Sequence, residues 1–97
     1  MNSVNPSDVP SLDQVVLIDV REPDEVAEVR IPGAVNLPMS SLNEHLDELP
    51  DGEFYVICHA GGRSAKVSQA LEAAGHRPIN VLGGITQWEA DGLAVER

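Results

Sequence analysis

Short apolar runs recur along the chain and are separated by segments with helical spacing. Residues 15–20 form an almost continuous β-branched apolar run, which is typical of a parallel strand buried on both faces. Residues 34–37, 54–58 and 79–82 give three further strand candidates, and residues 3–4 indicate a short edge strand. The pattern therefore predicts about five strands in one sheet.

The segments between these strands carry helix signals. Pro23 is followed by two acidic residues, which favour the start of a short helix, and Ile31-Pro32-Gly33 ends it. Ser41 and Glu44 have the spacing of a capping box. The leucines that follow this start have helical spacing: Leu42, Leu46 and Leu49. We expect an amphipathic helix there.

Two more helices are expected in the second half of the chain. The apolar positions of the first are spaced i, i+3, i+4 and i+7: Val67, Ala70, Leu71 and Ala74. Gly75 is well placed to cap its C-terminus. The second helix carries Ile85 and the core candidate Trp88, and Gly92 ends it.

Strands that alternate with helices over short connections indicate an α/β fold. We expect a single domain over residues 1–97, with a mostly parallel central sheet of about five strands flanked by helices on both faces. A chain of 97 residues buries roughly 60–70% of its unfolded surface, which suffices for one core without disulfides or metal.

Composition narrows the classes of function. The net charge of −10 argues against nucleic acid or an anionic membrane as the main partner. The N-terminus lacks a signal-peptide pattern and no apolar run reaches the length of a membrane span, so we expect a cytoplasmic protein. The single cysteine excludes an internal disulfide, a CxxC pair and a Cys-rich zinc site. Nothing suggests a metal or an organic cofactor.

That cysteine, Cys58, marks the strongest candidate for chemistry. It ends a predicted strand and faces the start of a predicted helix, where unpaired backbone N–H groups converge and stabilise negative charge. Gly61 and Gly62 can adopt positive φ and form an anion-binding nest, and Arg63 offers a planar set of donors to an oxyanion. The stretch predicts a reactive thiolate.

The sequence allows two roles for each of the polar residues near Cys58. Ser64 either caps the helix or donates a hydrogen bond to the sulfur. His59 either lines the pocket as a cation or proton donor, or turns away. Asp19 and Arg21 follow another strand and reach the same sheet edge, as does Gly83-Gly84. A structural ion pair that holds the loop is the favoured role for Asp19 and Arg21.

Four segments of the chain resemble signature segments of the rhodanese family, specifically its single-domain sulfurtransferases. In order, they are Leu17-Ile18-Asp19-Val20-Arg21-Glu22-Pro23, Ile31-Pro32-Gly33-Ala34-Val35-Asn36-Leu37-Pro38, the loop from Cys58 to Ser64, and Leu82-Gly83-Gly84-Ile85-Thr86-Gln87-Trp88 with Gly92-Leu93. Each segment alone is a weak signal, but four in the right order and spacing are a strong one, and the resemblance extends over nearly the whole chain.

This resemblance implies a thiosulfate sulfurtransferase that works through a persulfide on Cys58. The donor would be thiosulfate and the acceptor cyanide or a thiol, with ping-pong behaviour. The substrate-binding loop that would cradle the terminal sulfur is His59, Ala60, Gly61, Gly62, Arg63 and Ser64. Arg63 would steer the anionic donor.

The chain departs from the family where arginine often follows the cysteine. His59 replaces a permanent charge with one that depends on pH, which predicts that thiosulfate is a poor donor. A persulfide relay with a partner protein stays open, as does a non-catalytic binding module. A Cys-x5-Arg phosphatase or arsenate reductase is less favoured, because only four residues separate Cys58 from Arg63.

Overall fold

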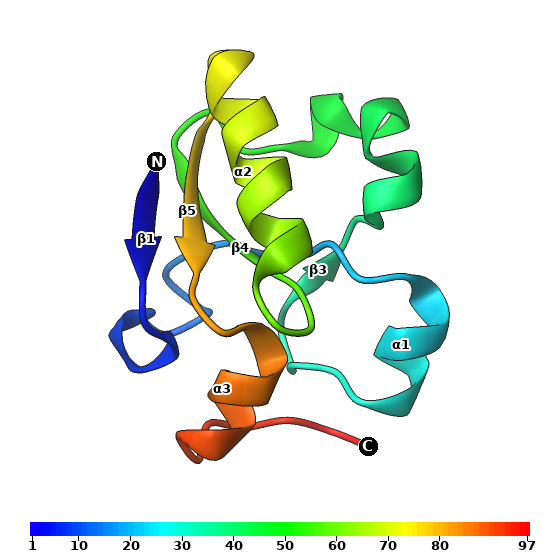
Figure 1. Cartoon of the computed structure of the whole chain (residues 1–97), viewed down its shortest axis with the longest axis vertical. Coiled ribbons are helices and arrows are strands. Elements are labelled where there is room, and N and C mark those ends of the chain that lie inside the picture. Colours follow the sequence, from blue (N-terminus) through cyan, green and yellow to red (C-terminus); the bar gives the residue numbers. More distant parts are fainter.

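Five parallel strands form the centre of the computed structural model, which describes residues 1–97 (Figure 1). Their order across the sheet is β1-β5-β4-β2-β3, and every pairing is parallel. The strands are β1 (Asn2–Val4), β2 (Leu17–Asp19), β3 (Val35–Asn36), β4 (Glu53–Ile57) and β5 (Arg77–Val81). The predicted α/β fold with a parallel sheet of about five strands is confirmed.

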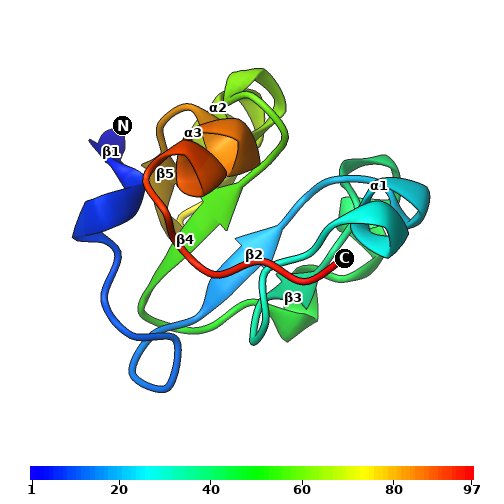
Figure 2. The same ribbon diagram turned by 90° about the horizontal axis from the view of Figure 1, so that it is seen from below.

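Helical segments connect these strands. The α-helices are α1 (Pro23–Glu28), α2 (Gly62–Ala73) and α3 (Gly84–Ala90), and the 3₁₀ helices are η1 (Pro6–Asp8), η2 (Met39–Glu44) and η3 (Leu46–Glu48). No helix is long and apolar enough to cross a bilayer. The C-terminal segment runs from α3 past the strand ends towards α1 (Figure 2).

Two hydrophobic clusters cover opposite faces of the sheet because strand side chains alternate between faces. On β4, Phe54 and Val56 join the cluster that contains Val67 and Leu71 of α2. Ile57, the next residue along β4, belongs to the other cluster. That second cluster includes two residues of α3, Ile85 and Trp88. Helices therefore flank both faces, as the sequence predicts.

The prediction of one amphipathic helix around Leu42, Leu46 and Leu49 is wrong, because the chain forms the two 3₁₀ helices η2 and η3 there. Their backbone bonds close three-residue turns, as in the 2.9 Å bond from the His45 N–H to the Leu42 carbonyl. His45, at φ −123° and ψ 15°, separates the two pieces. Leu42 and Leu49 are nevertheless buried in the core. Burial of the leucines, rather than capping by Ser41, determines this segment.

The burial of α2 differs from its predicted apolar face. Its buried residues are Ser64, Val67, Ser68 and Leu71, while Ala70 and Ala74 are exposed. The C-terminal cap at Gly75 is confirmed. Gly75 has φ 96°, and its N–H reaches the Glu72 carbonyl at 3.0 Å while the His76 N–H reaches that of Leu71 at 2.9 Å.

A buried ion pair after β2 fixes α1, which buries no residue of its own. The Arg21 guanidinium donates to the Asp19 carboxylate at 2.8 Å and to the carbonyl of Val29, just after α1, at 2.7 Å. It also reaches the Glu25 carbonyl within α1 at 3.4 Å. Arg21 therefore replaces the apolar contacts that would otherwise hold this helix.

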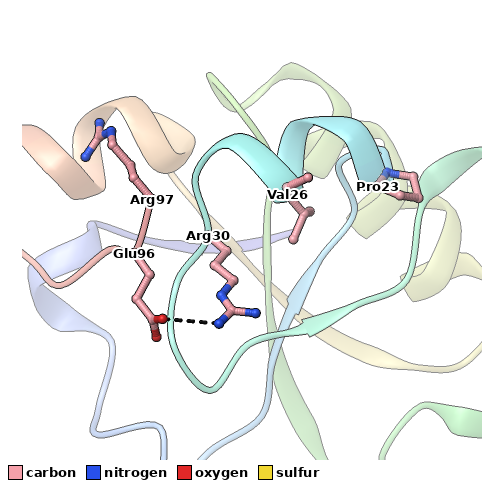
Figure 3. A pocket seen from close by; sticks show the side chains of 6 residues that line it. Pro23, Val26, Arg30, Glu96 and Arg97 are labelled. Atoms are coloured by element: carbon pink, nitrogen blue, oxygen red, sulfur yellow. Dashed lines mark hydrogen bonds and ion pairs between the residues drawn. The ribbon is translucent and has the colours of Figure 1, made fainter.

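We expect Asp19→Asn to lower the free energy of unfolding by roughly 3 kcal/mol, because it leaves the buried Arg21 charge without its partner. The matched control is Glu96→Gln, which removes a carboxylate from the exposed 3.1 Å ion pair with Arg30 (Figure 3). That change should cost at most about 1 kcal/mol. Urea unfolding followed by circular dichroism measures both, and equal losses would contradict the structural role of the buried pair.

Candidate active site

Two of the predicted segments, the loop after Cys58 and the segment that begins at Gly83-Gly84, meet at the carboxyl edge of the sheet. Cys58 follows β4 directly, and its carbonyl accepts a 2.8 Å hydrogen bond from the N–H of Ile85 in α3. The His59 carbonyl accepts from the N–H and the hydroxyl of Thr86, both at 3.1 Å. The loop after Cys58 is thus attached to the first turn of α3.

Gly84 allows this attachment. It has φ 59°, and a Cβ at this position would lie 2.5 Å from the Cys58 carbonyl oxygen and from the carbonyl carbon of His59. No larger residue fits that space without moving the loop. The sequence predicts only a tight turn beside the site here, whereas the structure makes Gly84 part of the loop's support.

The Cys58 sulfur lies inside the loop, where it accepts a hydrogen bond from the backbone and donates one to a side chain. The Gly61 N–H reaches the sulfur at 3.0 Å, and the Ser64 hydroxyl oxygen lies 3.3 Å from it. Gly61 has φ 109°, the conformation predicted for a nest. Gly62 does not have positive φ and begins α2, so the prediction is wrong for that glycine.

These donors stabilise the thiolate. Burial raises the pKa of Cys58, but the Ser64 hydroxyl and the backbone N–H groups of Ser64, Gly61 and Ala60 together lower it below the ordinary value. The side chain is almost fully buried, at 1% exposure. The arrangement is that of a nucleophilic sulfur whose charge is held by fixed dipoles.

Ser64 acts on the sulfur and the loop rather than as a helix cap. Its hydroxyl lies 3.2 Å from the Gly61 carbonyl as well as close to the sulfur, and no side chain caps the start of α2. Since a hydroxyl rotates to suit its partners, it can donate to the carbonyl beside a thiol and to the sulfur of a thiolate. The capping alternative is therefore wrong.

Arg63 is engaged by Glu25 of α1. The two side chains form a bidentate ion pair with N···O distances of 2.6 and 2.8 Å, each side chain about one-third exposed. The guanidinium lowers the pKa of Glu25 to about 2, and the carboxylate raises the pKa of Arg63. Sequence reasoning missed Glu25, because its place in the first turn of α1 indicated only a helix start.

The remaining predicted residues are divided between the loop surface and the interior. His59, Ala60 and Gly62 are exposed on the loop. Asp19 and Arg21 are buried and form an ion pair, as predicted, but the pair holds α1 rather than the loop after Cys58. None of the four surface pockets includes a residue of the loop from Cys58 to Ser64; the largest, of ≈ 390 Å³, lies between α1 and the C-terminal segment (Figure 3).

Known proteins with similar sequences belong to one family. The family model of the rhodanese-like domain matches residues 8–91. A protein named sulfurtransferase from Allochromatium vinosum is 36% identical over 101 residues, which cover 95% of this chain and 94% of the relative. The YtwF protein of Bacillus subtilis is 41% identical over 80 residues, covering 81% of this chain and 78% of its own.

Solved structures give the same result. The crystal structure of a rhodanese-related protein from Thermoplasma volcanium superposes with a TM-score of 0.91 at 33% identity. The match covers 99% of this chain and 98% of that one. The family model covers most of the chain and the solved structure shares its fold, so the protein belongs to the family of rhodanese-like domains.

Proposed function

We propose that this protein is a sulfurtransferase that moves sulfane sulfur through a persulfide on Cys58. The observation that carries the proposal is the sulfur held among the Gly61 N–H and the Ser64 hydroxyl, with its pKa lowered. The Allochromatium vinosum relative, named a sulfurtransferase, supports the same activity. A thiolate is the form that attacks a sulfane sulfur.

The first half-reaction forms one S–S bond and breaks another. The Cys58 thiolate attacks the outer sulfur of a donor such as thiosulfate, a Cys58–sulfur bond forms, and sulfite leaves with the electron pair of the broken bond. The charge then lies on the terminal sulfur of the persulfide, and the N–H groups of residues 59–64 would cradle it. No net oxidation occurs.

The second half-reaction regenerates the free thiolate of Cys58. A thiophilic acceptor, cyanide in assays or a thiol in cells, attacks the terminal sulfur of the persulfide, and the Cys58 thiolate is the leaving group. A thiolate with a lowered pKa leaves more readily, so the same hydrogen bonds assist both half-reactions. The two steps give ping-pong kinetics.

The competing chemistry of phosphate esters is less well supported. A phosphatase of the Cys-x5-Arg kind has five residues between its cysteine and its arginine, whereas only four residues separate Cys58 from Arg63. A purely binding module would not need the converging donors around the sulfur of Cys58. Both facts favour sulfur transfer.

Intact-mass spectrometry tests the covalent step. After incubation with excess thiosulfate, or with a small-molecule persulfide, the native chain should gain one sulfur atom and lose it on addition of cyanide. Cys58→Ser should gain none, because it lacks the nucleophile. If neither donor labels a folded chain with a free thiol, sulfur transfer through Cys58 is excluded.

Ser64→Ala should raise the pKa of the Cys58 thiol, because it removes the hydroxyl that donates to the thiolate. The rate of alkylation by iodoacetamide would then rise with pH at a higher midpoint than in the native chain. Ser68→Ala is the matched control: its hydroxyl is buried on the same helix and has no hydrogen-bond partner. Identical midpoints for Ser64→Ala and the native chain would contradict the role of Ser64.

A further inference from the structure

An apolar groove of ≈ 240 Å³ lies between α2 and the two 3₁₀ helices η2 and η3. Seven of the nine residues that line it are hydrophobic. Three of these residues, Leu42, Val67 and Leu71, are buried members of the core cluster that also contains Cys58. The groove therefore reaches the same part of the core as the active site, although no residue of the loop from Cys58 to Ser64 lines it.

Short side chains on α2 keep the groove open to solvent. Ala70 and Ala74 line it one helical turn apart, and both are exposed. On the opposite wall, the Met39 side chain is 39% exposed and Leu46 is only partly buried. A concave surface whose apolar lining stays accessible to solvent is typical of a ligand site.

No carboxylate lines this groove, although the chain has 16 acidic residues. Each of the other three pockets has one in its lining: Glu96, Asp91 or Asp19. The only charged residue that lines the groove is Lys66, which is the single lysine of the chain. Its side chain takes part in no ion pair. The groove thus combines an apolar lining with one unpaired cation.

Lys66 places this cation at the end of the groove that lies nearest to the carboxyl edge of the sheet. It is the first residue of α2 in the lining and lies one turn after Arg63. Met39 marks the same end of the opposite wall, because its N–H donates to the Val20 carbonyl at 3.0 Å, just beyond β2. A ligand with an apolar chain and one anionic end matches this arrangement: the chain leaves water for the groove, and the anion pairs with Lys66.

We propose that the groove binds a small carboxylate with an unbranched apolar chain, and that this carboxylate pairs with Lys66. The volume has room for about eight groups of the size of a water molecule, at about 30 Å³ each. The alkyl chain of octanoate therefore fits. This binding site goes beyond the proposed sulfur transfer, because it uses no residue of the loop that surrounds the Cys58 sulfur.

Titration of the full chain with sodium octanoate, followed by ¹H–¹⁵N correlation spectra, tests the site. The amide signals of Leu46, Ala70 and Ala74 should shift, and the shifts should saturate below about 10 mM octanoate. Octanol has the same chain length without the charge and should bind about fivefold more weakly, because it lacks the ion pair with Lys66. Shifts that do not saturate, or octanol that binds as tightly as octanoate, would overturn the assignment.

Lys66→Gln should weaken the binding of octanoate about fivefold and leave the binding of octanol within about twofold of the native chain. Arg77→Gln is the matched control, because Arg77 is exposed at the start of β5, forms no ion pair and lies outside the groove. Both substitutions change the net charge from −10 to −10 − 1 = −11. Octanoate binding that weakens equally in both variants would assign the effect to overall charge and overturn the role of Lys66.

Ala70→Leu tests whether the groove itself holds the chain of the ligand. It should weaken the binding of octanoate and of octanol at least about tenfold, because a helical side chain lies over the preceding turn and the added leucine fills the groove. The matched control is Ala73→Leu, at an exposed position of α2 outside the groove. Leucine is close to alanine in helix propensity, so both variants should fold. Unchanged binding in Ala70→Leu would exclude the groove as the site.

A second copy of the chain is the competing occupant of the groove. Analytical ultracentrifugation at the concentration of the titration should show a monomer with and without octanoate. A dimer that octanoate dissociates would assign the groove to self-association and overturn the proposal. None of these measurements needs a sulfur donor, so their failure would leave the sulfurtransferase function untouched. Failure of Cys58 to take up sulfur would likewise leave the carboxylate site untouched.

Discussion

The hydrogen bonds between the loop after Cys58 and the first turn of α3 are the interaction on which the site depends. They fix the carbonyls of Cys58 and His59 towards α3. With these carbonyls fixed, the following N–H groups face the sulfur, and Gly61 completes the turn with φ 109°. Gly84 permits this contact because a Cβ would overlap the two loop carbonyls. The chemistry of the thiol thus depends on backbone hydrogen bonds between residues that lie 27 positions apart in the sequence.

A second chain of contacts connects the buried core to the charge of the loop. Asp19 orients Arg21, and Arg21 holds α1 through the carbonyls of Glu25 and Val29. The placement of α1 brings the Glu25 carboxylate to Arg63. A buried ion pair adds little net stability by itself, since desolvation offsets much of its attraction. Here it positions an otherwise weakly packed helix, and that helix sets the charge beside the site.

The sequence by itself determined the fold class and singled out the candidate nucleophile. Near-continuous apolar runs such as residues 15–20 occur where both faces of a parallel strand are buried, so the sheet could be predicted from local pattern. The cap at Gly75 followed from the need for a residue that tolerates positive φ. Cys58 could be singled out because it is the only cysteine and lies between a strand and a helix.

Tertiary structure decided the features that depend on distant partners. The helix expected around Leu42 became two 3₁₀ turns, because fitting the leucines into the core outweighed local capping. Ser64 bonds to the sulfur instead of capping α2, which no local spacing distinguishes. Arg63 forms an ion pair with Glu25, which lies 38 residues earlier in the chain, and no sequence pattern predicts this pair. Local periodicity predicts which residues are buried and where the backbone needs positive φ. The partner of a charged side chain depends instead on how the helices and strands pack against one another.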